Sequence, residues 1–169
     1  MSTNLYDVTV PVFTKMLGNL SAILDKAAAF AEARKIEPVV LLNDRLAPDM
    51  FPLTRQVQIA CDFARNGAQR LAGLEPEKWE DKEASFAELK QRIEHTRSTL
   101  ARLKPDHFEQ ADVRHIEIKM RGEALTLSGL EYLNNLVLPN FYFHLTAAYA
   151  ILRHNGVELG KRDFIGALP

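Results

Sequence analysis

The sequence predicts an all-α protein, a four-helix bundle that carries one small β-hairpin. Three observations support this class. Apolar residues recur every three or four positions in four long segments, the spacing of an amphipathic helix. Capping boxes, in which a serine and a glutamate satisfy free backbone N–H groups, open two of these segments at Ser85 and Ser128. Residues 116–127 alternate apolar and polar side chains, the period of a strand.

The first helix has the clearest pattern. Its apolar stripe comprises Phe13, Leu17, Leu20, Leu24, Ala27 and Ala31. Pro11 allows two interpretations, because proline is tolerated in a first turn but bends a helix elsewhere. Either the helix begins there behind a Thr9 cap, or Pro11 kinks a helix that starts near Leu5.

An apolar connection with a proline near each end, residues 35–49, follows the first helix. It covers a site or an interface, or it is a loop packed against the core. The second helix is expected to start near Asp49 as N-cap, with Pro52 in its first turn, and to end at Gly73. A polar link then leads to the third helix, and Trp79 in this link is expected to fold back onto the bundle.

The third helix is expected from Ser85 to Lys104, where Pro105 stops it. The alternating segment that follows predicts a hairpin with its turn at Gly122. Because two strands alone are unstable, the hairpin should lie on the bundle.

The fourth helix starts after Ser128 and ends at Asn155-Gly156, with a kink or a join expected at Pro139, which lacks an N–H group. The tail should dock on the bundle or on a partner chain through Phe164, Ile165 and Leu168.

Composition restricts the class of protein. A chain of 169 residues suits one domain, residues 1–169, and a net charge of −1 argues against nucleic acid as a partner. No apolar run is long enough to span a membrane. The single cysteine, Cys61, cannot form an internal disulfide and lies among apolar neighbours, so we interpret it as a buried core residue and expect a cytoplasmic protein.

Four of the five histidines have ordinary interpretations. No two histidines are three or four residues apart, so no single helix builds a metal site. His95 is expected on the solvated side of the third helix. His107 and His115 flank a polar turn, and His154 suits the C-terminus of a helix, where a positive charge is favourable.

His144 differs, because it falls on the inner stripe of the fourth helix with Asn140 one turn before it. Gln58 and Asp62 are likewise one turn apart at the border of the inner face of the second helix. Buried polar groups need partners. These four residues, with the hydroxyl of Tyr149, predict a ligand-binding pocket; the alternative is a hydrogen-bond network that only fixes helix register.

Three consecutive aromatic residues, Phe141, Tyr142 and Phe143, cannot all face one core. Some of them must therefore contact the hairpin, the long connection or a second subunit. We expect a homodimer.

Three segments, YDVTVPVF, APDMFPLTRQVQIACDFA and above all PNFYFH, resemble an uncharacterised bacterial family grouped with the DinB/YfiT-like metalloenzymes. The resemblance covers nearly the whole chain. It implies an up-down-down-up four-helix bundle, often dimeric. It also implies a divalent zinc or nickel ion held by one histidine of the second helix and by two of the fourth helix that are four residues apart. Some such proteins are thiol-dependent transferases or hydrolases.

The sequence departs from that ligand set. The second helix has Gln56 and Gln58 but no histidine, and His144 has Asn140 before it and Ala148 after it. The metal therefore does not carry over. We predict a small-ligand-binding protein without a tightly bound metal; the alternatives are a metal- or thiol-dependent enzyme that uses His144, and a structural dimerisation module.

Overall fold

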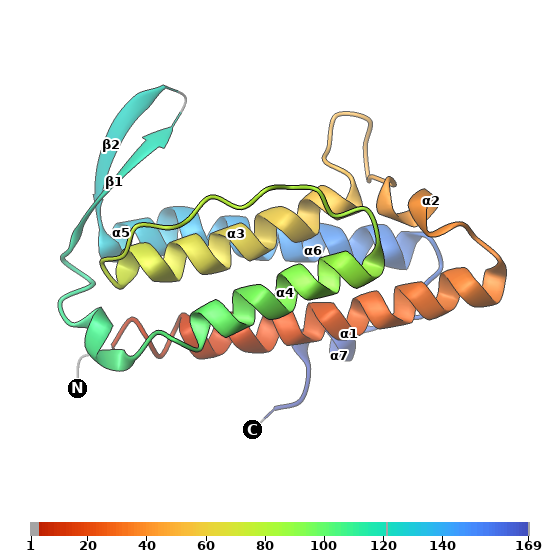
Figure 1. Ribbon diagram of the computed structural model, residues 1–169, viewed down its shortest axis with the longest axis horizontal. Coiled ribbons are helices and arrows are strands. Elements are labelled where there is room, and N and C mark those ends of the chain that lie inside the picture. Colours follow the sequence, from red (N-terminus) through yellow and green to blue (C-terminus); the bar gives the residue numbers. More distant parts are fainter. Residues whose placement is uncertain (1–3, 121, 169) are drawn as a thin grey trace.

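The computed structural model describes residues 4–120 and 122–168 and confirms the all-α four-helix bundle (Figure 1). The four long helices are α1 (Val10–Arg34), α3 (Leu53–Leu71), α4 (Phe86–Leu100) and α6 (Leu138–His154). In Figure 1, α1 and α6 run in one direction and α3 and α4 in the other, the up-down-down-up order that the resemblance implies. A crossover strap, residues 72–85, returns the chain along the bundle, so that α3 and α4 are parallel.

The stripe predicted for α1 is buried throughout. The helix begins at Val10 with Pro11 in its first turn, so the first of the two interpretations is correct. Thr9 does not cap it with its side chain, however. The Thr9 hydroxyl donates to the carbonyl of Leu5 at 2.6 Å instead.

The connection after α1 contains a short helix, α2 (Pro38–Leu42), whose Leu41 and Leu42 are buried. The predicted start of the second helix at Asp49 is wrong. α3 begins at Leu53, and Pro52 in extended conformation occupies the N-cap position. The reason is steric, because a proline disfavours the helical conformation of the residue before it.

A short 3₁₀ turn, η1 (Pro105–Phe108), leads toward the hairpin, which is formed as predicted by β1 (His115–Met120) and β2 (Glu123–Ser128). Its predicted position is only partly correct: the base packs on the bundle through the buried Ile116, and the rest projects away from the helices (Figure 1). The strands are antiparallel with Ile118 opposite Leu125, and Gly122 in the turn has a φ of 88°. At the base of the hairpin, a Cβ on Gly129 would lie 1.8 Å from the carbonyl oxygen of Ala111. Only glycine therefore fits there.

The fourth helix is a continuous path of α5 (Gly129–Tyr132), a π-helical turn η2 (Leu133–Val137) and α6. The capping box at Ser128 is complete: its hydroxyl accepts from the N–H of Glu131, and the Glu131 carboxylate accepts from the N–H of Ser128 at 2.9 Å. The break expected at Pro139 lies one turn earlier, in η2. The wider π turn accommodates the missing donor of the proline.

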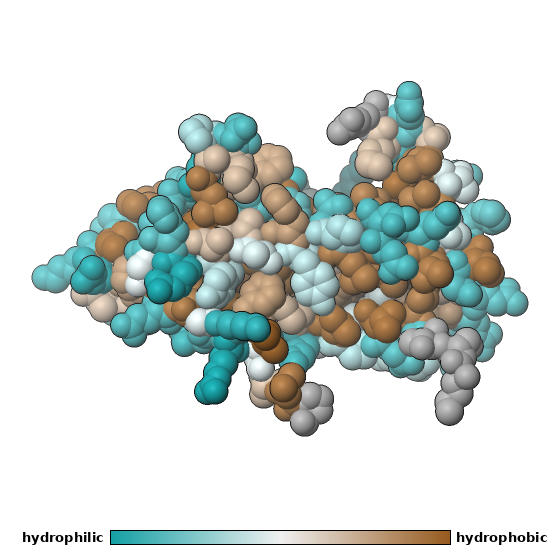
Figure 2. Space-filling view, turned by 180° about the vertical axis from the view of Figure 1, so that it is seen from behind, coloured by the Kyte–Doolittle hydropathy of each residue, from teal (hydrophilic) through white to brown (hydrophobic). Residues whose placement is uncertain are grey.

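The third helix ends at Leu100, earlier than predicted, and its opening serine, Ser85, accepts from the N–H of Glu88 at 3.2 Å. The tail docks on the bundle: α7 (Lys161–Ile165) lies along α1, where the Asn19 side chain donates to the carbonyl of Phe164 at 2.9 Å. Of the three predicted docking residues only Phe164 packs against the core, whereas Ile165 and Leu168 are exposed. Figure 2 shows hydrophobic side chains across the opposite face of the molecule and at the base of the hairpin, at the upper right. Among the described residues, no helix combines the length and apolarity needed to cross a membrane.

Candidate functional site

The buried imidazole of His144 faces α3, where its partner is Gln56. Nδ1 of His144 lies 2.7 Å from Oε1 of Gln56, and Nε2 of Gln56 donates to the carbonyl of Phe51 at 3.0 Å. Because that carbonyl can only accept, the Gln56 oxygen must face the histidine. Nδ1 of His144 therefore carries the proton, and Nε2 keeps its lone pair.

Burial, together with the positive charge of Arg55, lowers the pKa of His144 from 6.5 to about 4. The ring is therefore neutral at pH 7. Two aromatic rings hold it: Phe63 is stacked at 6.3 Å between centroids, and Phe143 lies edge-on at 5.2 Å. Among the described residues, Nε2 of His144 has no hydrogen-bond partner.

The other residues of the predicted pocket bond elsewhere. The Asn140 amide donates to the carbonyl of Leu136 at 2.7 Å and so satisfies the π turn of its own helix. Tyr149 packs edge-on against Phe164 and forms no hydrogen bond with His144. The expected convergence on His144 does not occur for either residue.

Gln58 and Asp62 bond on the far side of α3. At about 100° per residue, Gln58 lies about 200° around the helix from Gln56, so the two glutamines face different neighbours. Gln58 donates to the carboxylate of Glu83 at 2.8 Å, and Asp62 accepts from Arg92 at 2.8 Å. The predicted pocket is thus divided between two polar clusters, one on each side of α3.

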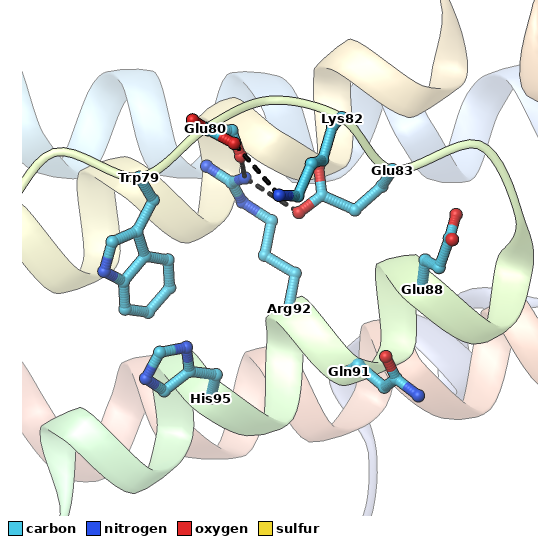
Figure 3. A pocket seen from close by; sticks show the side chains of 8 residues that line it. All are labelled: Trp79, Glu80, Lys82, Glu83, Glu88, Gln91, Arg92 and His95. Atoms are coloured by element: carbon cyan, nitrogen blue, oxygen red, sulfur yellow. Dashed lines mark hydrogen bonds and ion pairs between the residues drawn. The ribbon is translucent and has the colours of Figure 1, made fainter.

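The second cluster is centred on Arg92 of α4, whose side chain is only 2% exposed. Besides Asp62, its guanidinium donates to Glu83 at 3.0 Å and to the carbonyl of Glu80 at 3.1 Å (Figure 3). It also lies 2.9 Å from Asp81. Three of these partners belong to the strap. Arg92 therefore fixes the strap to α3 and α4.

Trp79, also in the strap, folds onto the bundle as predicted. The Arg65 guanidinium lies 3.6 Å from the indole centroid, and the His95 ring stacks at 4.1 Å (Figure 3). Two groups this close must occupy opposite faces of the ring. His95 is exposed as expected, but it is also part of this stack, and together with Trp79, Arg92 and strap carboxylates it lines a pocket of about 430 Å³.

A third feature is a cleft of about 650 Å³ between β1 and the surface of α3 and η2, which we call the hairpin cleft. Its apolar walls are Ile118 and Met120 on the hairpin and Phe63 and Leu136 on the bundle. Of the five predicted site residues, only Asp62 lines it. Phe63 connects the cleft with the site of His144, since its ring lines the first and stacks on the second.

At the floor of the hairpin cleft, Arg70 donates to the hydroxyl of Tyr132 at 3.2 Å. Sequence reasoning did not select Arg70, Gln56 or Arg92. Arg92 offered a signal, because it follows Leu89 by three residues on the apolar stripe of α4, where a solvated arginine is out of place. Gln56 offered a similar one, three residues after Leu53. Arg70 offered none.

The residues do not fit the three-histidine metal set that the resemblance implies. His144 is bonded to the side chain of Gln56, which occupies the side of α3 where a histidine would be required. In residues 4–120 and 122–168, no group of three or more histidine, cysteine, aspartate or glutamate residues is placed to hold an ion. The single cysteine, Cys61, is buried as predicted, and burial raises its pKa to about 12.

Comparison with known proteins agrees with this architecture. The model of the family described as domain of unknown function DUF1993 matches residues 5–165. A crystal structure of a DinB family member protein from Shewanella denitrificans is 50% identical in sequence, with a TM-score of 0.93 over 98% of this chain and 93% of that chain. No curated protein matches the chain. The chain therefore belongs to the DUF1993 family of DinB-like helical-bundle proteins.

Proposed function

We propose that this protein binds a small organic molecule in the hairpin cleft, without a metal held by a histidine set. The observation that carries the proposal is the cleft itself. Its volume of about 650 Å³ lies within the range of about 300–1,000 Å³ typical of small-molecule sites. Apolar side chains on two opposite walls and a few polar groups at the floor are the usual composition of such sites.

Close packing holds the bundle wall of the cleft and the base of its hairpin wall. Its bundle wall contains η2, which approaches α3 so closely that a Cβ on Gly67 would lie 2.6 Å from Val137. The segments that flank the hairpin wall meet at its base, where Gly129 packs against Ala111. A preformed cavity spares a ligand the cost of ordering its site.

A fragment screen by ligand-observed NMR tests the proposal. Leu136→Trp should fill the cleft and abolish fragment binding, whereas Leu130→Trp, at an exposed position of α5 outside the cleft, should leave it unchanged. Fragments that bind both variants equally would contradict the proposal. Elemental analysis should find no stoichiometric zinc or nickel; such a metal, lost in His144→Ala, would overturn the metal-free part.

A second candidate is a thiol-dependent transferase or hydrolase in which Nε2 of His144 accepts a proton. The fixed tautomer of His144 favours it, because a neutral imidazole with a free lone pair is a general base. The thiol would belong to a substrate, since Cys61 is buried. Turnover in a panel of thiol-transfer and hydrolysis assays, lost in His144→Ala and kept in His154→Ala, would support it.

The homodimer, the cytoplasmic location and the single domain of residues 1–169 remain predictions. Phe143 and Phe51, 56% and 53% exposed, are the aromatic side chains that a second copy would cover. Sedimentation of the wild type and of Phe143→Ser measures whether they do. A stable dimer with an unaffected hairpin cleft that binds nothing would favour the structural dimerisation module.

A further inference from the structure

We infer that the hairpin cleft selects an amphipathic anion, a molecule with an apolar body and a terminal carboxylate or phosphate. The inference rests on the proposed function and adds the chemical class of the ligand. It is carried by Arg70 and Tyr132 at the floor of the cleft.

Arg70 differs from the other two arginines of α3. Arg55 forms an ion pair with Asp81, and Arg65 lies 3.5 Å from Asp62. Arg70 has no carboxylate partner among the described residues, and its hydrogen bond goes to the neutral hydroxyl of Tyr132. A guanidinium offers five N–H groups, so several remain for an anion in the cleft.

Tyr132 supplies a further donor. Its oxygen accepts from Arg70 at 3.2 Å, which leaves the hydroxyl proton free to be donated to a ligand. Burial raises the pKa of Tyr132, although the charge of Arg70 opposes the shift, so the hydroxyl remains protonated at neutral pH. Arginine and tyrosine side by side form a two-point site for a carboxylate or phosphate oxygen pair.

The remaining charges of the cleft balance one another. Asp62 is already neutralised by Arg92 and Arg65. Glu75 and Glu117 are matched in number by Lys78 and Lys119, and none of these four forms an ion pair within the described residues. Arg70 is therefore a cation of the cleft with no carboxylate within ion-pair distance among the described residues.

The walls define the rest of the ligand. Ile118 and Met120 face Phe63 and Leu136 across the cleft, and Met120 is 43% exposed although it lies on the inward side of the hairpin. An apolar body between these walls would bury side chains that the protein alone leaves open to water. A purely polar anion would not.

The test uses the full chain and two dyes of similar shape, the anionic 8-anilinonaphthalene-1-sulfonate and the uncharged N-phenyl-1-naphthylamine. Both should bind the wild type with one-to-one stoichiometry, and Leu136→Trp should abolish both. Arg70→Gln should weaken the anionic dye about 10- to 100-fold, the loss expected for a charge-assisted hydrogen bond, and leave the uncharged dye within about two-fold. Tyr132→Phe should have a smaller effect in the same direction.

Arg102→Gln is the matched control, because it removes the same charge at an exposed position outside the cleft. Circular dichroism melting shows whether each variant is folded. Octanoate and octyl phosphate, added as competitors, separate a carboxylate from a phosphate ligand; displacement by neither would overturn the inference.

The failures are distinguishable. If Arg70→Gln and Arg102→Gln weaken the anionic dye equally while Leu136→Trp abolishes both dyes, the anion inference is wrong and the proposed function stands. If Leu136→Trp changes neither dye, the cleft is not the binding site and both proposals fail.

Discussion

The two sides of α3 carry polar clusters of opposite construction. Toward α6, His144 and Gln56 form a neutral pair, one hydrogen bond enclosed by aromatic rings. Toward α4, Arg92 and Asp62 belong to a network of charges that extends into the strap through Asp81 and Glu83. Both clusters are buried. The first offsets the cost of burying polar groups with one neutral hydrogen bond, and the second offsets it with ion pairs between opposite charges.

The difference follows from what each interface must hold. α3 and α6 pack directly along their length, so a single neutral bond satisfies their few polar groups. Residues 73–84 of the strap form no helix or strand, so no regular backbone hydrogen bonds hold them. Hydrogen bonds from the side chains of Arg92 and Arg65 to backbone carbonyls of the strap hold them instead. The charged cluster is therefore expected to be structural, and the neutral one is free to serve a site.

The largest effect is expected from Arg92→Met. It leaves the carboxylates of Asp62, Asp81 and Glu83 close together without their cation, which should cost about 3–5 kcal/mol of unfolding free energy. Urea denaturation measures it. Arg97→Met, which breaks a half-exposed pair with Glu94, should cost less than about 1 kcal/mol. Equal losses would show that the network does not hold the strap.

The pH dependence separates the two clusters. The folded pKa of His144 is about 4 and its ordinary value is 6.5, so between these values the unfolded chain binds more protons. Stability should be complete above pH 6.5 and fall by about 3 kcal/mol at most down to pH 4.

Glu83 acts in a lower window. Burial raises its pKa, but the hydrogen bonds from Arg92, the backbone and Gln58, together with the charge of Arg92, outweigh this and leave the pKa below 4.5, so its contribution is lost only as the pH falls below that value. The free energy of unfolding is measured from pH 3 to 8. His144→Phe should abolish its change between pH 4 and 6.5, and Glu83→Gln should abolish its change below pH 4.5. A slope between pH 4 and 6.5 that survives His144→Phe would contradict the assignment.

The fold was largely predictable from sequence because its signals are local. The stripe of α1, the capping box at Ser128 and the alternation around Gly122 each reflect backbone geometry within a few residues. The start of α3 was missed because Asp49 was taken as the N-cap with Pro52 inside the first turn, whereas the steric effect of the proline delays the helix to Leu53.

The site was harder to predict from sequence. An apolar stripe identifies the inner face of a helix, but it does not show which neighbouring element each edge of that face contacts. Gln58 and Asp62 border the inner face as expected, yet they turn toward α4 and the strap. Asn140 was assigned to a pocket, but its side chain donates to a backbone carbonyl of the π turn instead. The apolar periodicity of the sequence does not indicate a π turn. His144 was located correctly on the buried stripe, and its partner Gln56 was not selected.

A matched pair of glutamine substitutions compares the two sides of α3 directly. Gln56→Leu leaves the Nδ1–H of His144 buried without an acceptor, which should cost about 1–3 kcal/mol. Gln58→Leu should cost less, because Glu83 keeps its bond to Arg92. Chemical denaturation of both variants, and of the double variant Gln56→Leu/His144→Phe, measures the difference; the double variant should recover much of the loss if the pair is a self-contained hydrogen bond.

The smallest effect is expected where the charged cluster meets solvent, at the stack of His95 on Trp79. Because His95 is exposed, His95→Ala should change stability by only about 0.5 kcal/mol. Trp79 is the single tryptophan, so its emission reports this stack specifically, and removing the imidazole that covers one face should shift the spectrum. His107→Ala, at an exposed position in η1, should leave it unchanged. Identical spectra in both variants would mean that the indole is held by Arg65 alone, and that the outer wall of the 430 Å³ pocket is not part of the cluster.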